Sequence, residues 1–400
     1  MSVISVSRRE CFGMIAAAAG AMSLTESSRG FSANDTIQVA CLGTGGRSRH
    51  LMERLGKIPG VRIVGVCDVW GERRARAREL AAAGAFEETE FEKVLDRTDV
   101  DAVLIASPDH WHVPMTIAAC QAGKDVYVEK PLTHSVSEGE AVIQAVRKHQ
   151  RVVQVGTQQR SIPHLIEARE LVRSGLLGRV HKIHMSWNRN ADRWSTARPE
   201  ISATDVDWKR FLGSAPDQPF DSYRLANWRW FWDFGGGIFT DLMVHWLDTA
   251  RWMLDLGDAR SAVSIGHHMA SRGVWETPDT VQTLLDFGEN GPQAHFDGTF
   301  SNHYGRAELV LMGSEATLVC DRGAYEVIPQ RGKSAAPRQR IDSQSSERGL
   351  DFYEDIDCGR HHLQNWVNCL RTRQDPSCPV EEGVRSAAVA HLANTALRGT

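Results

Sequence analysis

The chain has few cysteines for its length, no cysteine pair at metal-ligand spacing and no excess of positive charge. Eight cysteines in 400 residues are too few for a scaffold built on disulfides. The sequence contains no C-x-x-C motif, the spacing at which cysteines of zinc sites are commonly paired. The formal net charge of −4 gives no sign of the concentrated basic face that nucleic-acid binding needs. We therefore expect neither a metal nor a nucleic-acid partner.

The nearest approach to a metal-ligand cluster lies close to the C-terminus. Its residues are Cys358, His361, His362 and Cys369. Zinc signatures pair their ligands at short, regular intervals, and these four residues do not. We expect no metal at this place.

The chain also lacks an apolar run long enough to span a membrane in its first 33 residues. The run Gly13–Leu24 is shorter than the roughly 20 residues that a spanning helix needs. It follows the pair Arg8 and Arg9, and the combination is typical of a twin-arginine export signal. We predict that residues 1–33 direct export to the periplasm, with no membrane anchoring afterwards. The alternative is a frayed N-terminal helix on a cytoplasmic protein.

The chain is long enough and hydrophobic enough to form two domains with their own cores, since 42% of its 400 residues are hydrophobic. Residues 34–155 alternate short β-branched runs with longer amphipathic stretches, which is the pattern of βαβ units. We predict an α/β fold whose N-terminal domain is a Rossmann, doubly wound parallel sheet. The predicted strands are Thr36–Leu42, Val61–Cys67, Val103–Ala106, Asp125–Val128 and Val152–Val155. The predicted helices are Arg47–Leu55, Glu72–Ala83, Pro114–Ala122 and Ser137–His149.

Residues 156–400 show longer strands with period-two alternation, separated by Gly/Asn turns. This pattern predicts a second, α+β domain on an open, mainly antiparallel sheet with one face covered by helices. We expect residues 331–349 to form a solvated loop and the closing helices to cover His361–Arg371 and Val384–Leu397. The predicted strands are Val180–Trp187, Val281–Phe287, Ala294–Phe300, Glu308–Met312 and Ala316–Cys320.

A glycine-rich turn stands between the first predicted strand and the first predicted helix. Gly43, Gly45 and Gly46 allow the backbone to turn tightly and to approach a pyrophosphate at the helix N-terminus, with Arg47 directly after them. Asp68 ends the second strand, from which a carboxylate accepts hydrogen bonds from the adenosine ribose. A carboxylate repels a 2′-phosphate, so these residues predict NAD as the cofactor rather than NADP.

Polar residues also follow the third and fourth strands, at carboxyl ends where ligands lie in open α/β sheets. Pro108 and His112 follow the third strand, and Glu129 and Lys130 follow the fourth. A lysine beside a nicotinamide can donate to a substrate oxygen and favour its oxyanion-like state.

A second glycine-rich turn opens a predicted helix that carries Asp241 and His245. Residues four apart share a helix face. The histidine can take a hydroxyl proton near neutral pH, and the carboxylate can orient the substrate or the imidazole. An Asp/His contact within the helix, without any function, fits this spacing as well.

Taken together, these motifs resemble the glucose-fructose oxidoreductase, inositol dehydrogenase and MocA (Gfo/Idh/MocA) family over about Thr36 to Arg398. The resemblance implies an NAD-dependent enzyme that acts on a sugar or polyol and assembles with copies of itself. It also implies that Lys130, Asp241 and His245 form the catalytic set. From it we expect a cis peptide bond before Pro131.

Two further stretches are assigned to the site. The stretch of residues 156–160 resembles an exported, twin-arginine subgroup of the family, and we expect Gln158 to contact the cofactor and Arg160 the substrate. The aromatic residues 227–234 run into the Asp241 helix, and aromatic rings suit the C–H face of a sugar. We expect Trp230 and Trp232 to contact the substrate, although about half of such rings are core residues.

Three functions remain open on the sequence. The first is a dehydrogenase that moves hydride from a sugar hydroxyl to bound nicotinamide. The second, implied by relatives that cleave glycosides, is a redox-neutral hydrolase or lyase that works through a transient keto-sugar and keeps its NAD tightly bound. The third is a binding protein without turnover, against which the intact set of Lys130, Asp241 and His245 argues.

Overall fold

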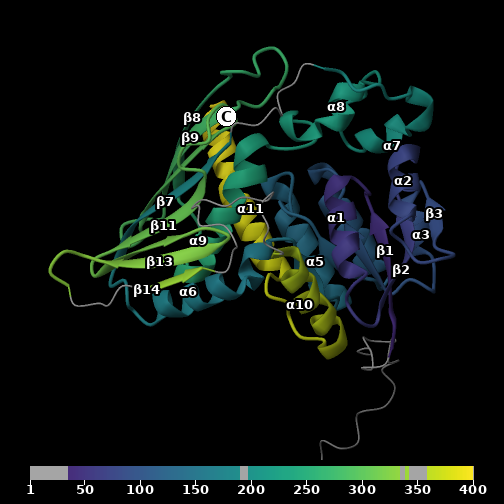
Figure 1. The fold of residues 1–400 in the computed structure, drawn as a ribbon. Helices are drawn as coiled ribbons and strands as arrows, with labels where there is room; N and C mark the ends of the chain where they lie inside the picture. Colours follow the sequence, from purple (N-terminus) through teal and green to yellow (C-terminus); the bar gives the residue numbers. More distant parts are fainter. Residues whose placement is uncertain (1–34, 190–196, 334–337, 342–357, 400) are drawn as a thin grey trace, which may run out of the picture.

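The computed structural model describes residues 35–189, 197–333, 338–341 and 358–399. The predicted export signal, residues 1–33, lies outside these ranges. The described chain forms two β-sheets with helices packed around and between them (Figure 1). In this part of the chain, no helix is both long and apolar enough to cross a membrane.

The N-terminal sheet has six parallel strands in the order β3-β2-β1-β4-β5-β6, which confirms the predicted doubly wound domain. Its central strands are buried along their whole length, as expected of a parallel sheet covered on both faces. The strands are β1 Ile37–Leu42, β2 Val61–Cys67, β3 Phe86–Glu88, β4 Ala102–Ile105, β5 Asp125–Val128 and β6 Val153–Val155. The helices are α1 Gly46–Leu55, α2 Gly71–Arg78, α3 Phe91–Leu95, α4 His112–Gln121 and α5 Gly139–His149.

The sequence pattern predicts neither β3 nor α3. The helix predicted over Glu72–Ala83 ends at Arg78 in the structure. β3 is three residues long and α3 five, so neither offers enough residues for a periodic pattern. The cis peptide bond expected between Lys130 and Pro131 is present.

The second sheet has eight strands in the order β14-β13-β12-β11-β7-β10-β9-β8. All neighbours pair antiparallel except β7 and β10, which are parallel, so the predicted mainly antiparallel sheet is confirmed. The sequence had missed three edge-side strands, and one of them lies inside the segment expected to be a loop. The strands are β7 Val180–Asn188, β8 Ser261–His267, β9 Thr280–Asp286, β10 Gln293–Thr299, β11 Ala307–Gly313, β12 Ala316–Cys320, β13 Ala324–Pro329 and β14 Arg338–Ile341.

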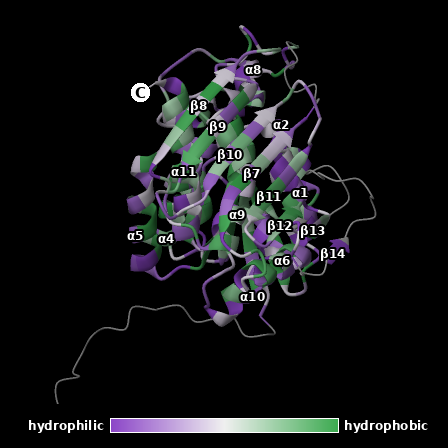
Figure 2. Ribbon diagram, turned by 90° about the vertical axis from the view of Figure 1, so that its left-hand side faces the viewer, coloured by the Kyte–Doolittle hydropathy of each residue, from purple (hydrophilic) through white to green (hydrophobic). Residues whose placement is uncertain are grey.

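The helices of the described ranges cover the inner face of this sheet, the face toward the N-terminal domain (Figure 1). Along β9 to β12, residues alternate between buried and partly exposed positions, as in a sheet with one open face. Figure 2 looks onto the open face, where hydrophobic and hydrophilic residues alternate along the strands. The remaining helices are α6 Pro163–Arg173, α7 Trp208–Leu212, α8 Ser222–Ala226, α9 Val244–Leu254, α10 Cys358–Thr372 and α11 Val380–Arg398.

The last two helices connect the two parts of the fold. α10 packs on the N-terminal sheet, because Trp366 and Leu370 belong to one buried cluster with Val39 of β1 and Leu51 of α1. α11 contacts α5, α9 and β8, and so lies between the domains (Figure 1). The division at residues 155 and 156 stays a prediction; the structure adds that the C-terminal segment packs on both sheets.

Candidate active site

A cavity of about 1000 Å³ lies between the carboxyl edge of the parallel sheet and the second domain. This size is at the upper end for a small-molecule or cofactor site. The cavity is lined by every residue that the sequence assigned to the cofactor and by the whole predicted catalytic set. These residues are Gly43, Gly45, Gly46, Arg47, Asp68, Pro108, His112, Glu129, Lys130, Gln158, Asp241 and His245.

The glycine turn after β1 has the shape that a dinucleotide requires. Gly43 has φ +74°, and a Cβ there would lie 2.6 Å from the Cα of Ser107, so no other residue fits. α1 begins at Gly46 without a side-chain cap, which leaves its first N–H groups for a ligand. A Cβ built on Gly46 would meet nothing within 4 Å. The turn therefore offers open space and donors for a pyrophosphate.

Asp68 fixes this turn from the end of β2. Its Oδ2 accepts from the Thr44 backbone N at 2.6 Å and from Thr44 Oγ1 at 3.2 Å, and its Oδ1 accepts from Trp70 N at 2.9 Å. Ser48, which stands where the third glycine of the dinucleotide fingerprint usually lies, is fully buried. Its small side chain thus still allows the close helix packing that the glycine provides.

Three of the expected cofactor residues form one buried chain at the sheet edge. Arg47 Nε donates to Glu129 Oε1 at 2.8 Å, and Arg47 Nη2 donates to Gln158 Oε1 at 2.7 Å. Burial opposes ionisation of Glu129, but Arg47 and then Lys130 outweigh it and hold the pKa of its carboxyl below the usual value. Glu129 thus stays ionised and anchors Arg47 at the start of α1.

His112 holds the backbone next to Lys130. Its Nδ1 lies 2.7 Å from the carbonyl oxygen of Pro131 and its Nε2 lies 3.0 Å from that of Ser107. Burial lowers the pKa of His112 to about 4, so only one of the two nitrogens donates at neutral pH. The ring therefore lies between the loops after β4 and β5 and donates a hydrogen bond to one of them.

Lys130 and Asp241 form an ion pair across the cavity. Lys130 Nζ donates to Asp241 Oδ1 at 3.1 Å and to the carbonyl oxygen of the same residue at 2.6 Å. Arg229 Nε also donates to Asp241 Oδ1, at 3.3 Å. Both side chains of the Lys130–Asp241 pair are more than four-fifths buried. The carboxylate thus orients two cations at one point of the wall.

The backbone that carries Asp241 is not a plain α-helix. Residues Phe239–Met243 form a π-helical turn, and α9 begins at Val244. Such turns recur at functional sites. Among the described residues, no hydrogen bond joins the His245 ring to the Asp241 carboxylate, which instead accepts from Lys130 and Arg229.

His245 is buried in the wall beside Trp187, with ring centroids 5.2 Å apart. Its Nδ1 is buried and has no hydrogen-bond partner among the described residues. Burial, followed by the charges of Lys130, Arg322, Arg47 and Arg189, holds the pKa of His245 well below its usual value. The imidazole is therefore neutral at physiological pH and able to accept a proton.

Asp109 is a lining residue that the sequence did not assign to the site, although it lies inside the motif that follows β4. It is buried, and desolvation raises the pKa of its carboxyl well above the usual value, against the opposing effect of Lys130 and then Arg229. Its place one residue after Pro108 could have suggested it.

Further arginines and aromatic rings line the cavity without any motif that marks them. Arg189 follows β7 and Arg322 follows β12, so only the folded sheet brings them together. Both guanidinium groups lie over the Trp187 ring, at 5.5 Å and 4.8 Å from its centroid. Trp228 and Arg229 come from the aromatic segment that the sequence singled out as a whole.

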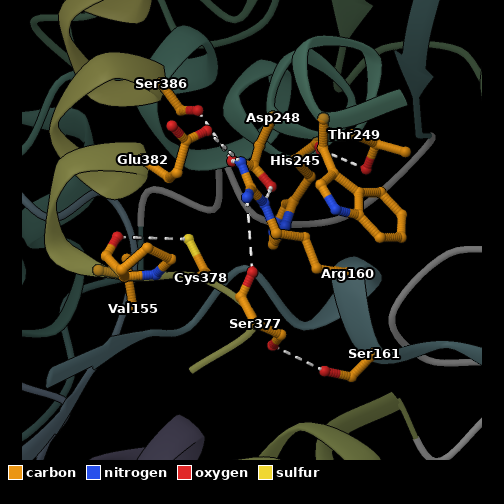
Figure 3. A network of polar contacts seen from close by, with 12 residues as sticks. Val155, Arg160, Ser161, His245, Asp248, Thr249, Ser377, Cys378, Glu382 and Ser386 are labelled. Atoms are coloured by element: carbon orange, nitrogen blue, oxygen red, sulfur yellow. Dashed lines mark hydrogen bonds and ion pairs between the residues drawn. The ribbon is translucent and has the colours of Figure 1, made fainter. Parts of the chain in front are cut away.

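The expected contact of Arg160 with the substrate stays a prediction, and the structure shows its guanidinium engaged by other residues. Arg160 does not line the cavity and is buried in a polar network behind α9 (Figure 3). Its Nε and Nη2 donate to the two carboxylate oxygens of Asp248 at 2.8 Å each, and Nη2 also donates to Glu382 at 3.0 Å. Ser386 donates to the same aspartate at 2.8 Å. The guanidinium is occupied because a buried charge needs partners.

The two tryptophans expected at the substrate differ. Trp230 lines the cavity, but it is also stacked on Trp275 with centroids 4.3 Å apart, as part of the core. Trp232 is not among the residues that line the cavity, and its ring packs under Arg398, so its substrate contact stays a prediction. Near the C-terminus, His362 donates from Nε2 to the Val155 carbonyl and accepts from Ser161, which gives it a packing role.

Comparison with known proteins agrees with this geometry. Residues 37–157 match the family model described as oxidoreductase family, NAD-binding Rossmann fold, and residues 165–319 match the GFO/IDH/MocA C-terminal domain. Inositol 2-dehydrogenase 4 of Saccharopolyspora erythraea is 32% identical over 361 residues, which are 89% of this chain and 91% of that protein.

Two other similarities bear on function. A glycosyl hydrolase family 109 protein of Solibacter usitatus is 32% identical over 118 residues, 27% of each chain. Among solved structures, levoglucosan dehydrogenase in complex with NADH and levoglucosan has a TM-score of 0.71 at 18% identity and covers 91% of this chain and 98% of its own. The structural likeness supports the fold.

Proposed function

Because the chain belongs to the Gfo/Idh/MocA family of NAD-dependent oxidoreductases that act on CH–OH groups, we propose that it oxidises one secondary hydroxyl of a sugar or polyol. The observation that carries this proposal is a buried histidine with a strongly lowered pKa beside a paired lysine in one cavity. NAD, when bound, supplies the hydride acceptor. The glycine turn, Arg47 and Asp68 would hold it.

Side chains of the chain itself would accept the proton, stabilise the developing charge and position the substrate. The substrate hydroxyl loses its proton to neutral His245 as the C–H hydrogen leaves as hydride, and a carbonyl forms. Lys130 donates a hydrogen bond to the oxygen and stabilises the negative charge that develops there. Asp241 keeps the lysine ammonium in place, and Arg229 offers donors to neighbouring hydroxyl groups.

A second function is redox-neutral cleavage of a glycoside. Oxidation of one sugar carbon acidifies the C–H bond of its neighbour, so that this proton is lost and the aglycone leaves with a proton on its oxygen. Water then adds to the double bond in a hydrolase, or does not in a lyase, and the hydride returns to the same sugar. The local similarity to the glycosyl hydrolase family 109 protein supports it, but only over about a quarter of the chain. Export along the twin-arginine route would favour it, because a protein without access to free NAD must retain its cofactor.

Retention sets a requirement on affinity. An exported enzyme at submicromolar concentration would need a dissociation constant in the nanomolar range, about −12 kcal/mol, to stay loaded. We therefore propose that NAD is tightly bound if the chain is exported. Assembly with copies of itself and the periplasmic location likewise stay predictions.

One experiment separates these functions. Purified protein is denatured and its released nucleotide is measured, and the native protein is screened against sugars and aryl glycosides. NADH absorbance reports oxidation and released aglycone reports cleavage. Steady NADH formation without aglycone supports the dehydrogenase, and aglycone release without net NADH supports the cleavage cycle. Absence of turnover on every sugar and polyol would contradict both.

A further inference from the structure

The open face of the eight-stranded sheet carries a cluster of three metal-ligating side chains outside the cavity. His184 lies on β7, and His295 and Asp297 lie on β10. The two strands are the parallel neighbours near the middle of the face (Figure 2). His184 stands opposite His295 in the register of the pair. Residues two apart on a strand share a face, so Asp297 points to the same side as His295.

The side chains are already assembled around one point. His184 Nε2 lies 2.6 Å from Asp297 Oδ1, and the two imidazole rings are stacked with centroids 5.1 Å apart and planes 8° apart. One ligand atom from each residue lies within 4.8 Å of the others. Asn188 Nδ2 donates to the second carboxylate oxygen at 2.9 Å and holds it in place. Metal ligands are oriented by such outer contacts.

The donor set selects the kind of ion. Two imidazoles with one carboxylate suit Zn²⁺ and its neighbours among the transition metals, whereas Ca²⁺ and Mg²⁺ prefer oxygen ligands alone. Zinc bonds to nitrogen and oxygen at about 2.0–2.2 Å, so its ligands stand roughly 3.3 Å apart in a tetrahedron. The three ligand atoms lie within 4.8 Å of one another, so binding requires the side chains to move closer to the ion. Three protein ligands leave the fourth position for water.

We propose that His184, His295 and Asp297 form a site for a divalent transition metal of the zinc type, which links β7 to β10 on the open face. No short sequence motif predicts the site, because His184 and Asp297 lie 113 residues apart in sequence. It contradicts the expectation that the chain binds no metal. Metal binding should stabilise the folded chain, since the unfolded chain does not bring the two strands together.

The test uses the full-length protein without a histidine tag, stripped with a chelator. Titration with Co²⁺ should give the visible absorption of a tetrahedral ion at one ion per chain, and Zn²⁺ should displace it. Zn²⁺ should also raise the melting temperature of the wild type. The variants are His295→Ala and Asp297→Asn, and the matched control is His181→Ala, which removes an exposed imidazole from β7, the strand of His184.

We expect both cluster variants to bind Co²⁺ at least about tenfold more weakly and to lose the Zn²⁺-dependent rise in melting temperature. Losing a metal ligand weakens binding at least as much as losing a residue that only hydrogen-bonds a ligand. The control should behave as wild type. The melting temperature of each stripped variant shows that it is folded. Binding that survives in both cluster variants would assign the metal to other groups, and no stoichiometric binding in the wild type would equally overturn the proposal.

Discussion

Lys130 Nζ contacts both the side chain and the backbone carbonyl of Asp241, at 3.1 Å and 2.6 Å. These two contacts join the loop after β5 to the π-helical turn before α9, and so tie the cofactor domain to the domain that carries His245. A lysine held at two points has a fixed position, which an oxyanion-stabilising group needs.

The first prediction concerns this lysine and the histidine beside it. Lys130→Ala and His245→Ala should each lower kcat by at least about a hundredfold, because positioned acid–base and oxyanion groups contribute effects of that size. NAD binding, measured by calorimetry, should change little. The control is Lys209→Ala, on the outside of α7. Retained turnover in both active-site variants would remove them from the mechanism.

The second prediction is the pH dependence of catalysis. His245 must be neutral to accept a proton, and burial holds its pKa well below the usual value. A lowered pKa extends the neutral form to lower pH, so kcat/KM should stay level from pH 8 to below 6.5 before it falls. A pH–rate profile in buffers of constant ionic strength checks this. A fall centred at pH 6.5 or above would mean that another group accepts the proton.

The third prediction concerns acid stability. Burial lowers the pKa of His110, His362 and His391 to about 4. Each stays neutral in the folded chain while the unfolded chain takes up a proton below about pH 6.5, so stability is full above that pH and is lost as the pH falls toward 4. A difference of this size corresponds to about 3 kcal/mol for a fully buried histidine such as His362.

Urea unfolding at several pH values between 7 and 4 tests this expectation. His391→Gln retains a donor for the Thr133 carbonyl but does not titrate, so its loss of stability over that range should be smaller than that of the wild type. Equal pH slopes in the two proteins would show that the histidine does not contribute to the acid transition.

The fourth prediction concerns cofactor choice. Asp68→Asn removes the charge that repels a 2′-phosphate but keeps a side-chain oxygen for the Thr44 N–H. The affinity for NADP should rise relative to that for NAD. Asp68→Ala should weaken both, because the turn also loses its hydrogen bonds. Dissociation constants for the two nucleotides measure the effect, and an unchanged NADP to NAD ratio in Asp68→Asn would place the discrimination elsewhere.

The fifth prediction tests the structural role of Arg160. Asp248→Asn removes the buried carboxylate that pairs with Arg160 and leaves only the partly exposed Glu382 as a charge partner; breaking a buried ion pair typically costs about 3–5 kcal/mol of unfolding free energy. The exposed pair Arg97–Asp99 is the control, since Asp99→Asn should cost less than about 1 kcal/mol. If Asp248→Asn instead raised the substrate KM and left stability unchanged, Arg160 would belong to the substrate site after all.

The sequence by itself determined the parallel sheet and most of the cofactor site. Gly43, Asp68 and Glu129 each follow a strand directly and Pro108 follows β4 by three residues, and the carboxyl ends of parallel strands meet at one edge. Local order along the chain therefore fixes their neighbourhood before any tertiary contact is known. The same holds for Lys130, which is the next residue along the chain from Glu129.

Only the tertiary structure decided which side chains face one another across long separations. Arg160 lies 88 residues from Asp248, and the packing of α9 turned it away from the cavity that its neighbour Gln158 lines. The register of β7 against β10 placed His184 beside His295, and no pattern along either strand could specify that pairing. The direction of a side chain follows from the packing of whole elements, which is set by burial of surface rather than by residue spacing.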